Sequence, residues 1–442
     1  MHVADRKRAR AAREQLRYLV NKLESFGFRR PERKFLYQMV FGILKVESLV
    51  LMAIARGLGE RIPIKKTEDR LRRNLGRKGL ADRLMAVLPV LARPRLDGEA
   101  ALVVDLTDIQ KPYGEKMEGR KRVWDGSAHK VGDGYWVTTV IGVNSSGVGD
   151  REVVPLYGEL YSLGYGPEVE DSENKRIRKA VECVASGVGK RHLWVFDRGF
   201  DRMDGMIRPL VEGRYRFLIR QMGNRMVEVE GKRQTVKDAA KGIKVFREVE
   251  AKRVHNGESR TVRFRVGARR VWVPRAAAWL WLVAFRNAEG GESWYLGRLE
   301  KHRGVGWEEL TTEEAADRAF EAYGKRWAVE EFHRHVKDTY QWEGLRVRTY
   351  ERLRNLTAVF WLAMFFLYTD WEGVKGRLLL DYAQKVTPNG RFKELQGFIY
   401  YKLSIVFAFL FSGLVCPLNE LARYKWVLRP RGPQLVLPLL LE

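Results

Sequence analysis

Cysteine is nearly absent from this sequence of 442 residues, and its scarcity excludes two classes of structure. Only Cys183 and Cys416 occur, far apart and without the spacing of metal ligands, which argues against a disulfide scaffold and a zinc site. Long apolar runs are missing as well, because the stretches 356–368 and 403–416 are shorter than the roughly 20 residues of a membrane span. We therefore expect buried helices in a soluble, cytoplasmic protein with no membrane partner.

Acidic residues are too few to balance the basic ones. The chain carries 81 Lys and Arg against 55 Asp and Glu, a formal charge of +26. Residues 1–98 hold 24 basic and 10 acidic side chains, so +14 of that charge lies in less than a quarter of the chain. Such a concentration of positive charge indicates a polyanionic partner, and nucleic acid is the first candidate.

The residue pattern changes several times along the chain and predicts an α/β protein with a mixed sheet and flanking helices. Short apolar runs at 101–105, 135–143, 152–157, 192–197 and 215–220 are expected strands, with a helix from Asp171 or Ser172 to about residue 185 and another over 203–211. The expected regions are a helical, basic region at 1–98, a first core part at 99–221, an inserted antiparallel β unit at 222–300, a final core part at 301–375, and a helical C-terminal region at 376–442.

The final core part opens with the sequence of a capping box, Thr311-Thr-Glu-Glu314, and no proline follows up to Tyr340. The pattern predicts one long helix. At about 100° per residue, one stripe of this helix carries four polar side chains over about 21 Å, and its opposite side is apolar. The stripe consists of Tyr323, Arg326, Glu330 and Lys337. Read without the rest of the chain, it is either part of a phosphodiester site or a solvated face with ion pairs.

Two expected strands end in carboxylates, Asp105 and Asp197. Neighbouring strands of an α/β sheet bring such residues together at one edge, although a single Asp there is often only a loop cap. Asp108 competes with Asp105, which stands directly at the end of the apolar run. With Glu330 from the long helix, three carboxylates could hold two hard divalent cations, the arrangement of phosphoryl-transfer enzymes.

Two motifs in a fixed order carry a resemblance to a known family. The run Asp197-Arg-Gly-Phe and the spacing Tyr323-x2-Arg326-x3-Glu330-x6-Lys337 closely resemble the bacterial DDE transposases of the insertion-sequence-four type. The likeness covers roughly residues 100–370, with the β-rich segment between the two motifs.

The resemblance implies an RNase H-like catalytic core with a metal triad of Asp105, Asp197 and Glu330. It implies Mg²⁺ as the cofactor at a two-metal site, with Mn²⁺ as a substitute. The implied activity is metal-dependent DNA cleavage and strand transfer in cut-and-paste transposition. The implied partners are double-stranded DNA at transposon ends, target DNA, and a second copy of the chain in the DNA complex. The implied location is the cytoplasm of a bacterium or archaeon, at the nucleoid during activity.

The resemblance also implies DNA contacts. It places Tyr323, Arg326 and Lys337 on phosphates of the transposon end, and Arg220 on DNA near the site. Trp294 lies where relatives with a hairpin mechanism place an aromatic ring on a flipped base, although a β-rich core also uses tryptophan in this way.

Other possibilities stay open from the sequence. A transposase-derived DNA-binding protein without catalysis and a nuclease on the same fold are the alternative functions. His333 and His335 point about 200° apart on a helix, so they do not share a metal, and we expect them at the surface or on phosphates.

Overall fold

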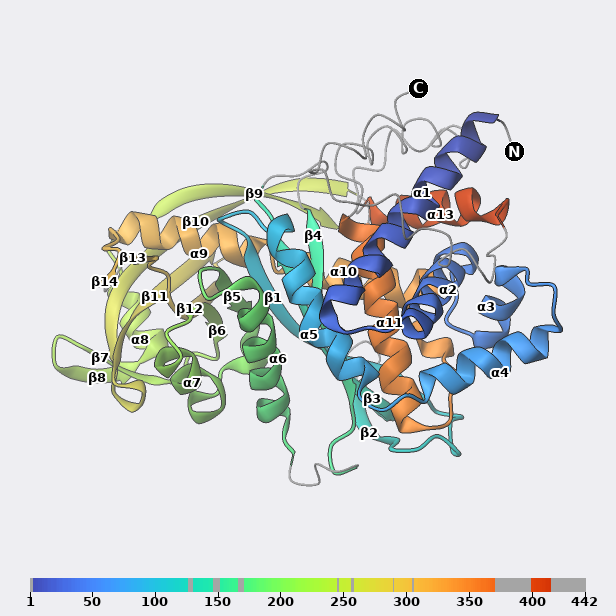
Figure 1. Ribbon diagram of the computed structural model, residues 1–442. Helices are drawn as coiled ribbons and strands as arrows, with labels where there is room; N and C mark the ends of the chain where they lie inside the picture. The colour runs from blue at the N-terminus through green and yellow to red at the C-terminus, as the bar shows by residue number, and fades with distance from the viewer. Residues whose placement is uncertain are drawn as a thin grey trace.

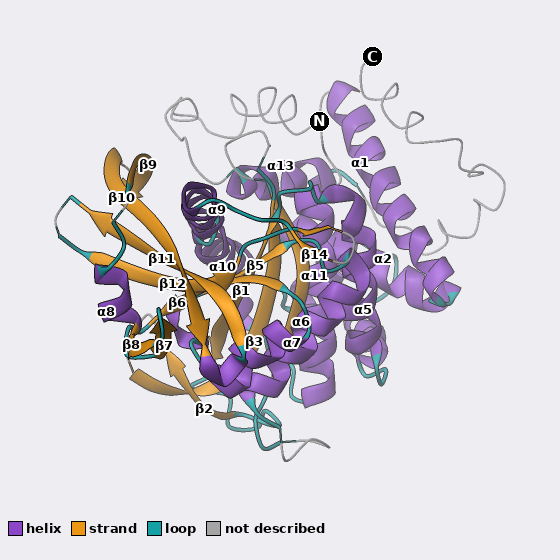
Figure 2. Ribbon diagram, turned by 90° about the vertical axis from the view of Figure 1, so that its left-hand side faces the viewer, coloured by secondary structure: helices purple, strands orange, loops and turns teal. Residues whose placement is uncertain are grey.

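The computed structural model shows a mixed α/β protein in which helices cover both faces of one large sheet (Figures 1 and 2). The expectation of a mixed sheet with flanking helices is confirmed at this level. The structure describes residues 3–125, 130–145, 152–165, 171–244, 246–255, 258–288, 290–303, 306–369 and 399–414.

The first hundred residues are helical, as predicted. Local signals set several helix ends: Pro31 stands in the first turn of the second helix, where a missing N–H costs nothing, and Gly59 ends the third helix with a φ of 64°. The helices are α1 (Val3–Lys22), α2 (Arg30–Val46), α3 (Leu51–Leu58), α4 (Ile64–Leu75) and α5 (Leu80–Ala92).

Five neighbouring strands of the sheet are those that the sequence predicted: β1 (Ala101–Gln110), β3 (Lys130–Val143), β4 (Val153–Tyr161), β5 (Leu193–Phe196) and β6 (Arg216–Gln221). A sixth strand, β2 (Lys121–Asp125), was not predicted and pairs with β3 at the edge of the sheet. Strands β1, β5 and β6 are parallel neighbours, whereas β3 is antiparallel to β1 and to β4. The strands β1, β5 and β6 are therefore the only adjacent parallel set among the described strands of this sheet.

The strands between 222 and 300 are antiparallel, as expected, but they do not form a sheet of their own. They are β7 (Met226–Val229), β8 (Lys232–Thr235), β9 (Arg247–His255), β10 (Glu258–Val273), β11 (Ala278–Asn287) and β12 (Glu292–Arg298). Because β12 pairs with β6, these strands continue the central sheet to its far edge at β8. The short helix α8 (Val236–Lys241) follows β8, and β13 (His302–Arg303) and β14 (Gly306–Trp307) form a separate hairpin.

Helices flank the sheet on two sides. On the side of α5 lie α6 (Glu173–Val188) and α7 (Arg208–Glu212), and on the other side lie α9 (Thr312–Gly324) and α10 (Trp327–Tyr340) (Figures 1 and 2). Helix α6 begins where the sequence predicted, since the Ser172 side chain accepts a hydrogen bond from the Lys175 N–H.

The prediction of one long helix up to Tyr340 is wrong, because the chain breaks between α9 and α10. The expected Thr311 capping box is present, with Thr311 and Glu314 bonded reciprocally. At the break, the N–H groups of Lys325 and Arg326 bond to carbonyls three residues back, at 3.1 and 3.0 Å. This tight turn follows Gly324, a residue of low helix propensity.

Helix α11 (Tyr350–Thr369) crosses the interior. Almost every residue from Leu353 onward is buried, as expected for a helix that is apolar on all sides. Helix α13 (Tyr400–Ser412) packs against it; the rest of the expected helical region at 376–442 lies largely outside the described residues. No single helix among the described residues is long and apolar enough to cross a membrane; α2 and α3 meet the criterion only together and are bent by 96°.

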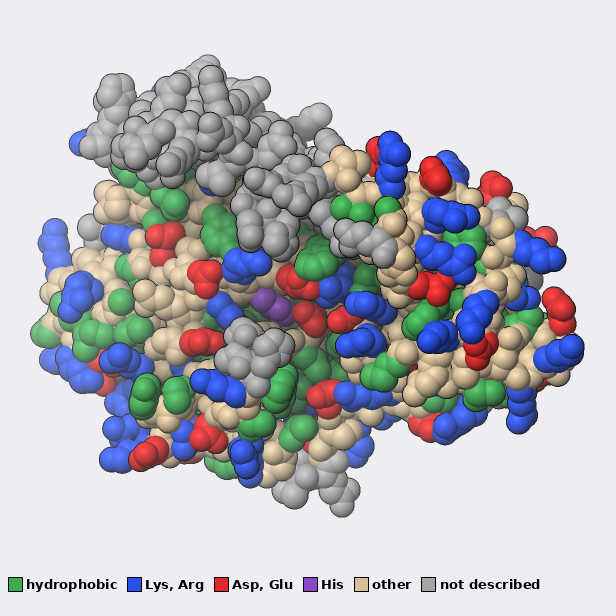
Figure 3. Space-filling model, turned by 180° about the vertical axis from the view of Figure 1, so that it is seen from behind, with side chains coloured by type: hydrophobic (Ala, Val, Ile, Leu, Met, Phe, Trp, Pro, Cys, Tyr) green, Lys and Arg blue, Asp and Glu red, His purple; other side chains and the backbone are tan. Residues whose placement is uncertain are grey.

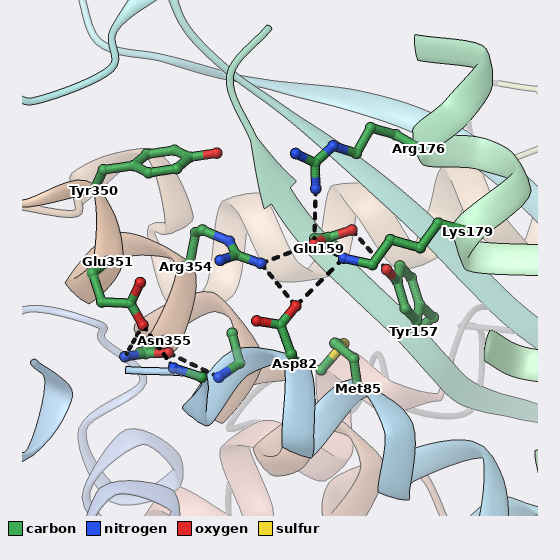
Figure 4. A network of polar contacts seen from close by, with 12 residues as sticks. Asp82, Met85, Tyr157, Glu159, Arg176, Lys179, Tyr350, Glu351, Arg354 and Asn355 are labelled. Atoms are coloured by element: carbon green, nitrogen blue, oxygen red, sulfur yellow. Dashed lines mark hydrogen bonds and ion pairs between the residues drawn. The ribbon is translucent and has the colours of Figure 1, made fainter. Parts of the chain in front are cut away.

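A buried polar network fastens α5 to the sheet and to α11 (Figure 4). Glu159 of β4 is 4% exposed and accepts hydrogen bonds from Tyr157 (2.7 Å), Lys179 (2.9 Å) and Arg354 (3.0 Å). Asp82 of α5 contacts the same Lys179 and Arg354 at 3.4 and 3.0 Å. Burial alone would raise the pKa of Glu159, but the neighbouring cations and the Tyr157 hydroxyl lower it below its usual value.

Asn355 of α11 makes a second connection to the N-terminal helices. Its amide donates to the carbonyls of Leu75 and Arg77 at 2.8 and 2.7 Å, and its oxygen accepts from the Ala81 N–H at 2.8 Å. A single buried side chain therefore provides hydrogen-bond partners for backbone groups at the end of α4 and at the start of α5.

Candidate active site

Two of the three predicted carboxylates stand side by side because of the strand pairing. In the parallel pair β1 and β5, Val104 lies opposite Phe196. Asp105 and Asp197 follow these two residues and come out at the same level of the sheet, with side chains 23% and 37% exposed. The predicted strand end at Asp105 is wrong, because β1 continues to Gln110 beside β3; only its pairing with β5 ends before Asp105, and this register brings the two carboxylates to the same level.

Glu330 comes to the same place from the helix above β1. It lies in the first turn of α10, which packs on β1, and its side chain is 36% exposed. The pKa of Asp105 is raised to about 7, mainly by burial and less by the negative charges of Asp197 and Glu330, against the opposing effects of Arg326 and the Leu106 N–H. The three carboxylates are therefore close enough to interact electrostatically.

Arg326 is buried against these carboxylates. Its guanidinium donates to Glu330 at 2.6 Å and lies 5.6 and 5.2 Å from the rings of Tyr323 and Trp327. Burial alone would lower the pKa of Arg326, but Tyr323, Asp197 and Glu330 raise it above its usual value. Only 7% of the residue is exposed. In this structure a side chain of the protein supplies the positive charge among the three carboxylates.

Asp197 has two further neighbours that the sequence singled out. The Tyr323 hydroxyl donates to its carboxylate at 3.0 Å, and Arg220 of β6 lies 3.9 Å from the same oxygen. The Tyr323 ring is fixed by an edge contact with Tyr295 at 4.5 Å. Tyr323, Arg220 and Arg326 thus surround one end of the carboxylate group.

Lys337 lies farther along, with the competitor Asp108. Its ammonium group is 3.7 Å from Asp108 and 3.5 Å from Glu343. The seven residues from Glu330 to Lys337 span about 10 Å of helix, and the three from Asp105 to Asp108 span about 10 Å of strand. Along α10 and β1, Glu330 therefore lies level with Asp105, and Lys337 lies level with Asp108. The structure therefore groups Asp105, and not Asp108, with Asp197 and Glu330.

The two histidines are not at the surface, so that part of the expectation is wrong. His333 is 8% exposed, bonds to the Thr139 hydroxyl at 3.0 Å and lies 3.7 Å from Asp105. His335 is fully buried between the hydroxyls of Tyr368 (2.7 Å) and Ser404 (2.9 Å). Burial lowers the pKa of each histidine to about 3, so both rings are neutral.

Trp294 lies at the edge of this region, on β12 opposite Gln221. Its ring covers Gly223, where an added Cβ would come within 2.7 Å of the ring. The side chain is half-buried and packs against the core.

Seen from the side of α9 and α10, acidic side chains and a histidine gather near the middle of the molecular face, with Lys and Arg around them (Figure 3). Within the described residues, no three His, Cys, Asp or Glu side chains are close enough to form a metal-binding group. The donor chemistry nevertheless suits a hard cation, since the side chains that interact here are three carboxylates.

Comparisons with known proteins add little to this geometry. No family model matches the chain, and no curated protein matches it. Among solved structures, a piggyBac transposase synaptic complex with hairpin DNA matches with a TM-score of 0.30 and 9% identity. The match covers 78% of this chain and 57% of that one, so the chain spans little more than half of its length.

Proposed function

We propose that this protein is a DNA transposase of the DDE type, with an RNase H-like core, that cleaves and joins DNA at transposon ends. The observation that carries the proposal is the convergence of Asp105, Asp197 and Glu330 from two parallel strands and a helix. Asp197 and Glu330 are the acidic positions of the two sequence motifs, and Asp105 is the third acidic residue that the resemblance implies.

The proposed cofactor is Mg²⁺, held by the three carboxylates. When bound, it would supply Lewis-acid activation of the attacking oxygen and stabilise the leaving oxygen of an in-line displacement. Carboxylate oxygens suit this hard cation, which would take over the charge compensation that Arg326 supplies in this structure.

The chain's own residues have two proposed roles besides metal binding. Tyr323 and Arg220 hold the Asp197 carboxylate in place from two directions. Arg326 carries a planar fork of donors that can grip a phosphate with two parallel hydrogen bonds once it releases Glu330. Lys337 offers a point charge farther along the same helix.

The basic region at 1–98 is the proposed reader of the DNA ends, and Trp294 a proposed platform for an unstacked base. A second copy of the chain in the DNA complex is part of the same proposal, as is action on the DNA of a bacterium or archaeon.

The deciding experiment begins with sequencing the DNA that flanks the gene for inverted repeats, and then tests cleavage of duplex DNA that carries these repeats. Wild-type protein should cut with Mg²⁺ or Mn²⁺ and not with EDTA, and should join the released end to a target plasmid. Glu330→Gln should bind the same DNA without cutting it, because it removes one negative charge and little shape. A Glu330→Gln protein that cuts at the wild-type rate would contradict the triad.

The outcomes separate the alternatives. Cutting without joining identifies a nuclease on this fold. Binding without metal-dependent cutting identifies a DNA-binding protein that has lost the chemistry.

A further inference from the structure

A short extended segment between Gly344 and Tyr350 presents two arginines to solvent. Leu345 and Val347 are 2% and 5% exposed, whereas Arg346 and Arg348 are exposed. This alternation has the period of two of an extended chain, so the apolar residues anchor the segment and the arginines point outward.

The backbone of this segment is held by one side chain and one backbone group of the connection between β1 and β2. The Lys111 ammonium group donates to the carbonyls of Glu343 and Leu345, the second at 2.9 Å. The Arg348 carbonyl accepts the Glu118 N–H at 2.9 Å. Burial lowers the pKa of Lys111 to about 8, so a desolvated lysine holds a segment without regular secondary structure. The positions of the two arginines are therefore fixed from beneath.

The two guanidinium groups differ from most cations nearby in having no carboxylate within ion-pair distance among the described residues. Lys337, by contrast, contacts Asp108 and Glu343. Arg346 lies near enough to Lys111 to lower the pKa of that lysine, so two cations are neighbours here. Exposed cations without carboxylate partners, near a further cation, suit an anionic partner.

The segment connects the candidate active site with the N-terminal helices. At one end, Glu343 pairs with Lys337 of α10, the helix that carries Glu330. At the other end, the Arg352 guanidinium donates to the Arg72 carbonyl of α4 at 3.2 Å, and α4 lies beside α11 (Figure 1). A polyanion that follows this surface would extend from the carboxylates to the basic helical region.

We propose that Arg346 and Arg348 form a phosphate track that grips the backbone of double-stranded DNA between the active site and α4. The proposal rests on the proposed function, in that DNA is the substrate. Both guanidinium groups contact phosphates and not bases, so the track positions the duplex without reading its sequence. The absence of competing carboxylates leaves both available for this contact.

The test is equilibrium binding of a fluorescein-labelled duplex of arbitrary sequence, measured over a range of salt concentrations. For Arg346→Ala/Arg348→Ala, the salt slope should fall by about 1.8, because each phosphate contact contributes about 0.9. The factor by which the affinity falls between 50 and 200 mM salt should then be about twelve times smaller for this variant than for wild type. Arg346→Lys/Arg348→Lys should keep most of the slope, since it keeps the charges.

The matched control is Lys232→Ala/Arg233→Ala, which removes two exposed cations from β8 at the far edge of the sheet. Its slope should equal that of wild type, and thermal unfolding should show all variants folded. Equal slopes for the Arg346/Arg348 variant and wild type overturn the track and leave the proposed function standing. A wild-type protein that does not bind the duplex overturns both.

Discussion

The guanidinium of Arg326 lies 2.6 Å from the carboxylate of Glu330, four residues later in the chain. The same guanidinium lowers the pKa of Asp105 and interacts with Asp197. Any cation that binds these three carboxylates therefore competes with a side chain that already neutralises them. The competition makes the site testable without an activity assay.

Replacing Arg326 should expose this competition. Arg326→Met leaves the carboxylates without their cation, so we expect the free energy of unfolding in EDTA to fall by about 1–3 kcal/mol. The loss should lie near the lower end of this range, because water reaches the 36% of the Glu330 side chain that is exposed. Added Mg²⁺ should raise the unfolding temperature of this variant more than that of wild type. Arg334→Met removes an exposed arginine of the same helix and should change stability by less than about 0.5 kcal/mol. Identical Mg²⁺ shifts in wild type and Arg326→Met would contradict the assignment.

Removing one carboxylate should stabilise the metal-free protein. Asp105 is partly buried beside two like charges, so Asp105→Asn should raise the unfolding temperature in EDTA by about 2–4 °C while abolishing metal-dependent cleavage. The control is Asp201→Asn, because the Asp201 carboxylate accepts from the Met222 N–H at 2.9 Å and from Arg225. That variant should unfold at a lower temperature. A destabilised Asp105→Asn would mean that Asp105 serves the fold and not the chemistry.

The network around Glu159 should be costly to disturb. Glu159→Gln leaves Lys179, Arg354 and Arg176 with less negative charge in a buried place, and we expect a loss of about 2–5 kcal/mol in urea unfolding. Glu182→Gln on the exposed face of α6 makes the same chemical change and should be nearly neutral. Equal urea midpoints of unfolding for both variants would show that the network contributes nothing to stability.

His335 should make the protein sensitive to mild acid. Burial lowers its pKa to about 3 in the folded protein from the ordinary histidine value of 6.5, so the unfolded chain binds the proton first and stability falls as the pH drops from about 6.5 toward 3. At pH 5 the loss from this residue is about 2 kcal/mol. His335→Gln keeps a polar side chain between Tyr368 and Ser404 but does not titrate. The drop in unfolding temperature between about pH 7.5 and pH 5 should be smaller for this variant, and an equal drop would exclude His335 as the cause.

Local signals in the sequence were sufficient for several features of the fold. Ser172 and Thr311 start helices where their hydroxyls can cap the first turn, and the carboxylates at 105 and 197 follow apolar runs that do form neighbouring strands. These features depend on residues within a few positions of each other, which is the range that a sequence pattern reports.

The features that sequence missed depend on contacts between distant segments. The burial of His335 requires Ser404 of α13, 69 residues away. The joining of the β-rich segment to the central sheet requires β12 to pair with β6, across the intervening strands. Arg326 is buried because Asp197 and Tyr323 lie where the fold places them, and not because of its helical position. The roles of the site residues in metal and DNA binding stay predictions.

The contacts of Asn355 have a consequence for how the chain is made. Its partner Ala81 lies 274 residues earlier, so α5 is synthesised long before the residue that completes its first turn. At 5–20 residues per second this interval lasts roughly 15–55 seconds. Strand β4 and helix α6, which also pack on α5, emerge earlier, so only the face of α5 that α11 covers lacks its partner throughout that time. A product that stops short of residue 350 therefore keeps two of the elements that pack on α5 and lacks the third, the helix that joins α5 to the end of α4.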